Sequence, residues 1–381
     1  MDKAFVIVEI SDVHFGALDS KQLMTELDSE FIDKIEAMPI IDMIVFAGDL
    51  YNSKLSLNSP HSKASFLFLT KVCEIAKKKQ NAAVRVVKGT SSHDNDQLDN
   101  LEVFKDICDF KVINTLSYEN FRGMKIVYIP EEYIEDSSYY DELYNGSYDL
   151  GFGHGLVKEA SFVAHKQESE VTMKKAPVFD TNKLLGAIKG VCAFGHIHTP
   201  MRIKKRFYYS GSFSRWCFGE EDDKGFNVIY YTPEYPEKTK VEFIKNNLAR
   251  IYDTVTIDVV DASIENTLKT IKDAIDMTSF YKKRIVVNIG KSVTDRRLMT
   301  DLINETFGKY SMVNIVINNL EKEEIRRQSD EKVERLLSEY GFIFDKSIPK
   351  DEKIQRYINK KYNRNIPLDK IRNYLFNKII E

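Results

Sequence analysis

The stretch ISDVH at residues 10–14 decides how the rest of this sequence is interpreted. It closes an apolar run from Phe5 to Ile10, which predicts a buried central strand. Because strand side chains alternate between faces, we expect Asp12 and His14 to project to the same side. A carboxylate beside an imidazole is a ligand pair for a divalent metal. An Asp-x-His after a strand is nevertheless more often a capped turn with a surface histidine. Whether this pair binds a metal is therefore judged from the residues that follow the later strands.

Other predicted strands end in residues of the same kind. The apolar run 41–47 is followed by Gly48 and Asp49, and the run 83–87 is followed by GTSSHD at residues 89–94. The metal-binding or proton-transferring residues that follow strands are Asp12, His14, Asp49, His93, Asp94, His154, His196 and His198. Each histidine alone is as readily a loop residue. Since parallel strands place their carboxyl ends at one edge of a sheet, the set as a whole predicts a site.

Six of these residues are candidate metal ligands, namely Asp12, His14, Asp49, His154, His196 and His198. They are too many for one tetrahedral site and suit two divalent ions about 3.5–4 Å apart, bridged by a carboxylate. Nitrogen and oxygen donors without thiolate favour Mn²⁺, Fe²⁺ or Zn²⁺. Such a pair activates water and clamps a phosphate, which predicts phosphoester hydrolysis. His93 is the candidate to protonate the leaving oxygen, and Asp94 is one candidate to orient it.

Composition bounds the remaining possibilities. The chain has 381 residues, 43% hydrophobic and 30% charged, with a net charge of −3. This length predicts two or three domains, and the charge excludes a general attraction to nucleic acid. The four cysteines form no CxxC pair and are expected to be reduced thiols. Without a signal pattern or a run long enough to span a bilayer, we expect a cytoplasmic protein that does not bind membranes.

The pattern of predicted strands and helices changes in the last third of the chain. From Ile251 to Leu320 predicted strands and helices alternate, which indicates a small α/β unit. After that the chain is charged and helical, with two amphipathic stripes. These stripes suit either a docking element or a terminal helical hairpin packed on its own chain. We therefore expect an α/β protein with domains at residues 1–248, 249–320 and 321–381.

Taken together, the motifs resemble those of a known family. The five phosphoesterase motifs of the calcineurin-like metallophosphoesterases are matched in order by Asp12-x-His14, Gly48-Asp49, Gly89…His93-Asp94, His154 and Gly195-His196-x-His198. The segment 209–226 is similar to the one that follows the last histidine motif in the SbcD-type DNA repair and recombination nucleases, which include phage recombination endonuclease subunits. The motif resemblance covers residues 1 to about 245. The rest of the chain resembles the family only in the order of its predicted domains.

The resemblance implies a fold, a site and partners. The fold would be a metallophosphoesterase sandwich, two mixed sheets flanked by helices, with a small α/β cap that binds DNA and C-terminal helices that dock an SbcC-type coiled-coil ATPase. One metal would be held by Asp12, His14, Asp49 and His198. The other would be held by Asp49, His154, His196 and one more group. His93 matches the family's general acid. We also expect a homodimer, formed through helices at 64–73 and 98–108.

The sequence departs from the family pattern in two places. The third motif is Gly-Asn-His-Asp in the family, and its asparagine binds the second metal. Here the loop is longer and lacks asparagine, and Ser92 occupies the place beside His93. A hydroxyl is a poorer ligand than an amide carbonyl. Many relatives also carry a phosphate-binding histidine shortly after Gly-Asp, where this chain has Asn52, which we expect to bind substrate by a hydrogen bond.

The leading prediction is a nuclease subunit that uses two divalent ions, Mn²⁺ in first place, to cleave DNA phosphodiesters. It would act as an exonuclease on duplex ends and an endonuclease on single strands, in DNA repair, recombination and replication. Two other functions stay open. One is a small-substrate phosphodiesterase on the same fold. The other is a non-catalytic scaffold whose metal site has decayed at residues 90–92. Basic runs at 202–206 and 282–284 are candidates to follow a DNA backbone or are solvated faces.

Overall fold

The structure is a computed structural model. It describes residues 4–17, 19–134, 136–160, 177–259, 263–276, 281–290, 293, 295–319, 342, 348–362 and 366–372. The chain forms two compact units, the first made of residues 1–253 with 279–282 and the second of residues 254–278 with 283–381. Residues 321–341 of the predicted C-terminal domain lie outside the described residues, and the predicted domain boundaries stay predictions.

The first sheet of the first unit has six strands in the order β14-β13-β1-β2-β3-β4. Strands β1 to β4 run parallel, whereas β13 and β14 are antiparallel to their neighbours. The strands are β1 (Phe5–Ile10), β2 (Met43–Ala47), β3 (Ala83–Val87), β4 (Phe110–Ile113), β13 (Gly225–Tyr231) and β14 (Lys240–Lys245). The carboxyl ends of β1, β2 and β3 therefore lie at one edge of this sheet.

The second sheet also has six strands, in the order β11-β12-β10-β7-β6-β5. Its inner strands are parallel, and the two edge strands β11 and β5 are antiparallel to their neighbours. The strands are β5 (Ser117–Phe121), β6 (Met124–Ile129), β7 (Leu150–His154), β10 (Cys192–Gly195), β11 (Met201–Ile203) and β12 (Phe207–Tyr209). Strands β8 (Leu156–Val157) and β9 (Val178–Phe179) form a separate two-stranded sheet.

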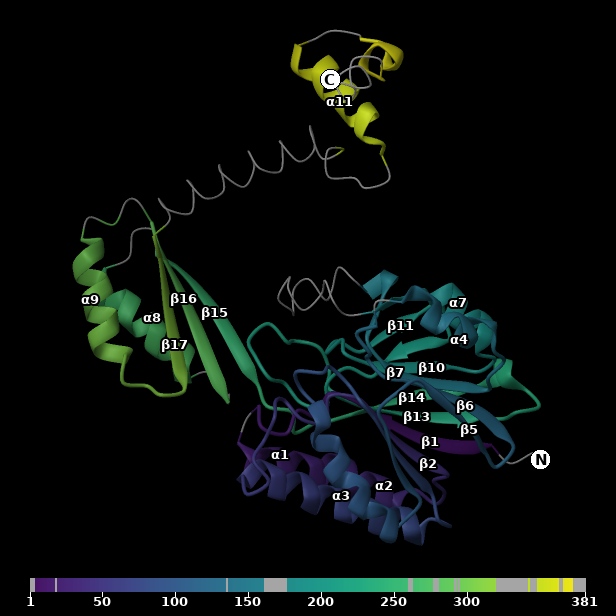
Figure 1. Ribbon diagram of the computed structural model, residues 1–381. Helices are drawn as coiled ribbons and strands as arrows, with labels where there is room; N and C mark the ends of the chain where they lie inside the picture. The colour runs from purple at the N-terminus through teal and green to yellow at the C-terminus, as the bar shows by residue number, and fades with distance from the viewer. Residues whose placement is uncertain are drawn as a thin grey trace. The chain divides into compact units, whose positions relative to one another are not determined.

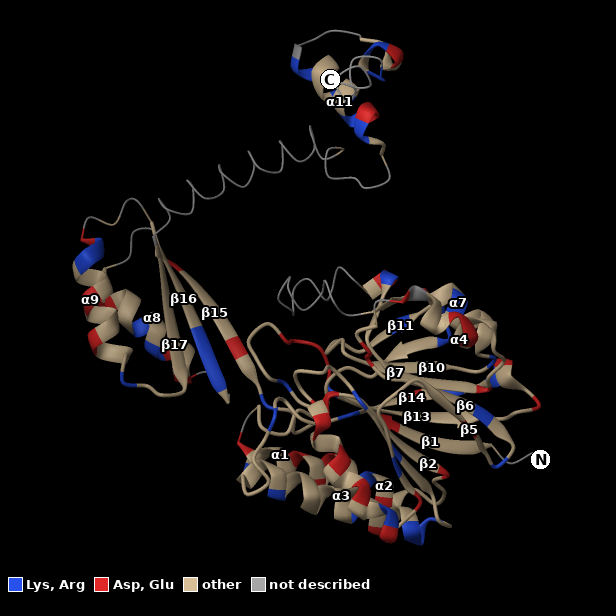
Figure 2. Ribbon diagram, in the orientation of Figure 1, with Lys and Arg blue, Asp and Glu red and all other residues tan. Residues whose placement is uncertain are grey.

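Helices cover the outer faces of the two sheets (Figure 1). The helices on the first sheet are α1 (Ser20–Leu27), α2 (Asp33–Ala37) and α3 (Pro60–Lys78), and those on the second are α4 (Asp141–Asn145) and α7 (Thr181–Ala187). Basic and acidic residues are spread along α2 and α3, whereas the central strands are mostly uncharged (Figure 2). The layers of the first unit are thus helices, sheet, sheet and helices.

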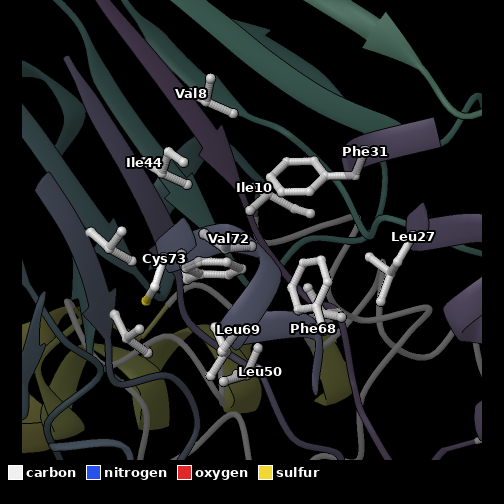
Figure 3. Close-up of a cluster of buried hydrophobic side chains, with 14 of the residues drawn as sticks. Val8, Ile10, Leu27, Phe31, Ile44, Leu50, Phe68, Leu69, Val72 and Cys73 are labelled. Carbon is white, nitrogen blue, oxygen red and sulfur yellow. The ribbon is translucent and has the colours of Figure 1, made fainter. Parts of the chain in front are cut away.

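The core explains why the first strand is apolar at every position except Glu9. In β1, Val8 and Ile10 point toward the helices and pack in one cluster with Phe31 and Phe68 (Figure 3). Ile7, on the opposite face of the same strand, belongs to the cluster between the two sheets. A strand covered on both faces needs apolar side chains at successive positions. This burial fixes where β1 ends, and so where the following loop begins.

One carboxyl group is buried in the same strand. Glu9 is completely buried, and it accepts hydrogen bonds from Ser210 Oγ at 3.0 Å and from Asn227 Nδ2 at 2.8 Å. Burial raises the pKa of Glu9 to about 8, although the two hydrogen bonds oppose that shift. Glu9 is therefore largely protonated at neutral pH, which removes most of the cost of burying it.

The second unit contains the predicted small α/β element. Its sheet has the order β15-β16-β17, with β16 and β17 parallel. The elements in chain order are β15 (Tyr252–Val259), α8 (Ile264–Asp276), β16 (Lys282–Ile289), α9 (Arg296–Phe307) and β17 (Val313–Asn319), followed later by α11 (Lys350–Tyr362). Alternate residues of β16, among them Ile285 and Val287, are buried, as are Ile271 of α8 and Ile303 of α9.

The predicted fold class is confirmed: α/β, with two mixed sheets flanked by helices. Local detail differs at two helices. The predicted helix from Leu98 to Cys108 is a 3₁₀ run at Asn95–Asp106. Apolar residues at helical spacing from Leu23 to Ile35 predict one helix, but a π-helical segment at Asp28–Ile32 lies between α1 and α2. Other short 3₁₀ segments are Ser137–Tyr140, Lys158–Ala160 and Pro236–Lys238. Within the described parts of the chain, no helix has both the length and the apolar character needed to cross a bilayer.

Ser59-Pro60 predicts the start of a helix, and α3 begins there. Ser59 caps it by accepting a hydrogen bond from the Ser62 backbone N–H at 3.0 Å, and Pro60 takes the first helical position. Most of the apolar side chains of this helix lie in the core, among them Phe68, which is fully buried. Leu67, however, is 61% exposed, and Val103 of the 3₁₀ run is 57% exposed. The homodimer expected through this region stays a prediction.

Replacing Phe68 with alanine tests the core on the helical side of the first sheet. Its ring lies 5.9 Å from the Phe15 and Phe46 rings and 5.7 Å from the Phe31 ring. We expect Phe68→Ala to lower the free energy of unfolding by about 3–5 kcal/mol, measured by urea denaturation. Leu67→Ala, at the exposed neighbouring position, is the control and should cost less than about 0.5 kcal/mol. Similar losses for both variants would contradict this packing.

Glu9→Gln tests the buried carboxyl group. Since the folded pKa of Glu9 is about 8 and the usual value is 4.5, its protonation stabilises the fold below pH 4.5. That contribution is lost as pH rises toward 8, at up to about 1.4 kcal/mol per pH unit. We expect the variant to gain stability relative to the wild type between pH 5 and 8, measured by urea denaturation. Glu242→Gln, at a half-exposed position, should show no such trend. A stability difference for Glu9→Gln that stays constant with pH would refute the assignment.

Candidate metal centre

Loops from both sheets bring ligand residues together at one edge. The loops after β1, β2 and β3 come from the first sheet, and β7 and β10 contribute from the second. Backbone hydrogen bonds hold the first two loops side by side, since Asp12 N donates to Gly48 O at 3.1 Å and His14 N donates to Asp49 O at 3.0 Å. The backbone itself therefore places Asp12 and His14 next to Asp49.

The first group of candidate ligands consists of Asp12, His14 and His198. Asp12 Oδ1 lies 3.8 Å from the Nε2 atoms of both His14 and His198. The two Nε2 atoms face each other at 3.2 Å. Asp12 is fixed from behind, because the backbone N–H of His196 donates to its carboxylate at 3.1 Å and the Ser11 hydroxyl donates at 2.5 Å. Two lone-pair nitrogens facing each other beside a carboxylate suit a cation between them.

The second group consists of Glu131, His154 and His196, all of them buried. Glu131 Oε2 lies 3.0 Å from His196 Nδ1 and 3.7 Å from His154 Nε2. His154 donates its Nδ1 proton to the Ala47 carbonyl oxygen at 2.8 Å, which leaves Nε2 directed at the carboxylates. The predicted histidines of this group are thus joined by a carboxylate that we did not predict.

Asp49 lies between the two groups. Its Oδ2 atom is 3.4 Å from His154 Nε2 and 3.9 Å from His14 Nε2. The backbone N–H of Thr90 donates to Oδ1 at 2.6 Å, and the Thr90 hydroxyl donates to Oδ2 at 3.2 Å. One carboxylate therefore faces an imidazole of each group, which is the position of a bridging ligand in a two-metal site.

The two loop histidines after β10 belong to different groups. His196 faces Glu131, whereas His198 faces His14. His198 is oriented by Glu220, whose Oε1 lies 2.8 Å from His198 Nδ1. A carboxylate on the distal nitrogen of a ligand histidine fixes both the ring and its tautomer. The resemblance implies the same grouping, and the two side chains therefore do not project together.

Four of the candidate ligands have a strained backbone. The φ angles of Asp12, His14 and Asp49 are 52°, 53° and 51°, and that of His196 is 101°. Non-glycine residues rarely adopt positive φ, and such strain is concentrated at functional sites. Asp12 and His14 thus lie beyond the end of β1 and converge through a turn. Strand alternation, which we gave as the reason, was the wrong explanation for a correct proximity.

Glycines make room for the ligands. A Cβ atom on Gly48, which has a φ of 88°, would lie 2.2 Å from His154 Nδ1. A Cβ atom on Gly89 would lie 2.2 Å from Asp49 Oδ1. Both positions require the absence of a side chain, because a ligand from another loop approaches the backbone there. The Gly-Asp and Gly-Thr-Ser-Ser-His-Asp motifs are therefore parts of one packed arrangement.

The electrostatics of the centre favour a positive charge. Burial alone would lower the pKa of His154, but Asp49 and the nearby carboxylates raise it to about 10. Burial would raise the pKa of Asp49, yet His154 and His93 bring it well below its usual value. Burial lowers the pKa of His14 well below the usual value, so this imidazole is neutral and able to donate a lone pair. The donor set thus fits divalent cations.

His93 is oriented by Asp49. Its Nδ1 atom lies 2.7 Å from Asp49 Oδ2, and its side chain is 33% exposed. Burial lowers the pKa of His93, but the hydrogen bond and charge of Asp49 outweigh that effect and raise it. His93 is therefore a partly accessible imidazole that Asp49 makes more basic than usual.

Asp94 has a different contact from the one expected. It is fully buried, and its carboxylate accepts hydrogen bonds from the backbone N–H groups of Gly89, Asp49 and Tyr51 at 2.8–3.0 Å. It therefore ties the loop after β3 to the loop after β2. In this way it acts on Asp49, which in turn orients His93.

Other loop residues also lie differently from their expected positions. Ser92 is exposed, so it does not take the place of the family's asparagine. Thr90 does approach the site, with its hydroxyl 3.3 Å from Glu131 Oε2 and 3.5 Å from His154 Nε2. Asn52 is half-buried and donates its backbone N–H to Phe15 O. Its role in substrate binding stays a prediction.

Glu131 is the residue that sequence reasoning missed. It lies two positions after the end of β6, so it follows a predicted strand as the other ligands do. We passed over it because it lies outside the five motifs. An acidic residue after a strand parallel to the ones that end in histidines was the available signal.

Comparisons with known proteins add little. The sequence matches no family model and no curated protein. The solved structures that resemble the chain include an archaeal phosphodiesterase, at 10% identity and a TM-score of 0.29, covering 63% of this chain and 99% of that one. Similarity at this level does not bear on function, which is therefore argued from the side chains.

Asp94→Ala and His93→Ala should separate structural from chemical roles. Removing the Asp94 carboxylate leaves three buried N–H groups without their acceptor, so we expect a loss of at least about 2 kcal/mol in the free energy of unfolding. The His93 side chain hydrogen-bonds Asp49, lies against the His14 ring and is partly exposed, so His93→Ala should cost less than about 1 kcal/mol. Urea denaturation measures both. Equal stability of the two variants would rule out the role given to Asp94.

Proposed function

We propose that this protein is a metal-dependent phosphoesterase that cleaves the phosphodiester bonds of DNA. One observation carries the proposal: two groups of ligands, all buried except the partly exposed His198, flank the single carboxylate of Asp49. The first group is Asp12, His14 and His198, and the second is Glu131, His154 and His196. When bound, two divalent ions would activate a water molecule and neutralise the charge of a phosphate.

The protein's own residues account for the other requirements of the reaction. His93 is placed to give a proton to the leaving oxygen, because Asp49 raises its pKa and its ring is partly accessible. Asp49 fixes the ring through Nδ1, which leaves Nε2 as the atom that can face a substrate. Asp94 keeps Asp49 in position through the shared loop contacts.

DNA as the substrate is supported by the segment 209–226, which is similar to that of SbcD-type nucleases. Residues of this segment contact His198. Lys224 is buried and donates to the His198 carbonyl oxygen at 2.8 Å, and Glu220 orients the His198 ring. Arg215 in turn donates to the Glu220 carbonyl oxygen at 2.9 Å. The segment that resembles the nucleases is therefore built into the proposed active site.

The basic runs contribute less to this proposal than their charge suggests. The Arg206 guanidinium donates to the carbonyl oxygens of Leu185, Ile188 and Lys189. Lys283 is buried and donates to the Ala274 carbonyl oxygen. These two charges support the fold and are not available to bind phosphates. Binding of DNA by the remaining basic residues, docking of a coiled-coil ATPase and use of Mn²⁺ are parts of the proposal.

The proposal is tested with the full-length protein, Mn²⁺ and circular single-stranded DNA, a substrate for endonucleolytic cleavage. We expect cleavage that EDTA abolishes. Removing a general acid typically costs 10²–10⁴-fold in rate, so His93→Asn should be at least about 100-fold slower. The control is His61→Asn, since His61 contacts Ser20 and lies outside the ligand groups. His61→Asn should cleave at the wild-type rate.

The other two functions give different results in the same assay. Hydrolysis of a small nitrophenyl phosphodiester without cleavage of single-stranded or linear duplex DNA would show a small-substrate phosphodiesterase. Bound Mn²⁺ without hydrolysis of any of these substrates would show a non-catalytic scaffold. Cleavage by His93→Asn at the wild-type rate would refute the role of His93.

A further inference from the structure

Glu131 is placed as a ligand although no expected motif includes it. Its side chain is 1% exposed, and Oε2 lies 3.0 Å from His196 Nδ1 and 3.7 Å from His154 Nε2. The same oxygen accepts a hydrogen bond from the Thr90 hydroxyl at 3.3 Å. The three facing atoms come from the loop after β3, from the end of β7 and from the loop after β10. A single oxygen is thus the meeting point of three segments.

The orientation of the carboxylate is fixed by separate contacts. Glu131 Oε1 accepts a hydrogen bond from the Tyr133 hydroxyl at 2.9 Å, and Glu131 N donates to the Lys88 carbonyl oxygen at 3.3 Å. One oxygen is therefore held by tyrosine while the other is directed at the imidazoles. Supporting hydrogen bonds on the distal atom are the usual accompaniment of a ligand carboxylate.

A plain ion pair does not account for this arrangement. His154 Nε2 faces two carboxylates, since Asp49 Oδ2 lies 3.4 Å away on the other side. The converging donor atoms are Asp49 Oδ2, Glu131 Oε2, His154 Nε2 and His196 Nδ1. A proton on His154 Nε2 pairs with one oxygen at a time, whereas a divalent cation beside these atoms would bind several of them together. Two buried carboxylates beside two imidazoles match the donors that Mn²⁺ or Zn²⁺ accepts.

We propose that Glu131 is the remaining ligand of the second ion, completing a set with Asp49, His154 and His196. Its carboxylate stands in for the asparagine amide that the resembling family uses. The departure at residues 90–92 therefore does not leave the second site incomplete, and the site gains a negative charge. That charge strengthens the binding of a divalent ion and reduces the net positive charge presented to a phosphate. The inference rests on the proposed function, because it concerns the same centre.

Calorimetric titration of the full-length protein with Mn²⁺ tests the proposal. The wild type should bind two ions. Glu131→Gln keeps the size of the side chain and removes its charge, so one ion should bind as before and the other at least about 100-fold more weakly, beyond what loss of a merely supporting group costs. Glu132→Gln is the matched control, because Glu132 pairs with Leu116 N and Tyr139 and contacts no candidate ligand. It should bind two ions with unchanged affinity.

Tyr133→Phe adds a graded step. The Tyr133 hydroxyl supports Glu131 from its distal oxygen, so its removal should weaken one ion by roughly 10-fold without abolishing binding. An effect on affinity as large as that of Glu131→Gln would contradict the assignment of Glu131, rather than Tyr133, as the ligand.

The outcomes separate this proposal from the proposed function. Two ions bound by Glu131→Gln with wild-type affinities would overturn the ligand role of Glu131 and leave the phosphoesterase proposal standing. No Mn²⁺ bound by the wild type would refute both. If Glu131→Gln does not fold, as judged by circular dichroism, anomalous scattering from wild-type crystals grown with Mn²⁺ decides. An ion bonded to Glu131 Oε2 supports the proposal, and an ion held only by Asp49, His154 and His196 overturns it.

Discussion

The carboxylate of Asp49 faces imidazoles from three other segments of the chain, and the rest of the site depends on this contact. His93, His154 and His14 lie 2.7, 3.4 and 3.9 Å from its Oδ2 atom. Burial by itself would make the negative charge of the Asp49 carboxylate costly. The charge is stable there only because groups that carry or can take up a positive charge surround it. The side-chain contacts of Asp94 with the loop backbone fix where that carboxylate lies.

The two sheets supply the rigidity that this contact requires. Strands β1, β2 and β3 of one sheet and β7 and β10 of the other all end at the site, and the apolar layer between the sheets holds these ends in place. The backbone strain at Asp12, His14 and Asp49 is sustained by the packed strands that precede each turn. The ligand residues lie directly beyond packed strands, so their mutual distances are fixed before a metal ion binds. Binding of the ion therefore orders few side chains and loses little conformational entropy.

Much of this arrangement could be predicted from the sequence. Strand ends followed by Asp or His were sufficient to select Asp12, His14, Asp49, His154, His196 and His198, and these residues do lie together. The reason given for Asp12 and His14 was wrong, because their proximity comes from positive φ angles beyond β1. The proximity of these residues could be predicted because sequence patterns reveal parallel strands, whose carboxyl ends lie at one edge. The path of each turn could not be predicted, because it depends on contacts between loops.

What could not be predicted depends on distant contacts. Glu131 has no neighbouring motif, and its burial results from packing against distant loops, among them those of His196, 65 positions away, and Thr90, 41 positions away. Whether Thr90 or Ser92 approaches the ligands is decided by the course of the loop after β3, which Asp94 fixes through backbone groups. Sequence patterns reveal which residues end a strand, but not which side chain fills the space between two loops.

The central claim is that Asp49 bridges two divalent ions. Electron paramagnetic resonance of the full-length protein loaded with two equivalents of Mn²⁺ tests it most directly, because two Mn²⁺ ions that share a carboxylate are magnetically coupled. We predict the spectrum of a coupled pair, which Asp49→Asn should convert largely to the signals of single or free ions. A wild-type spectrum showing only isolated Mn²⁺ ions would contradict the account.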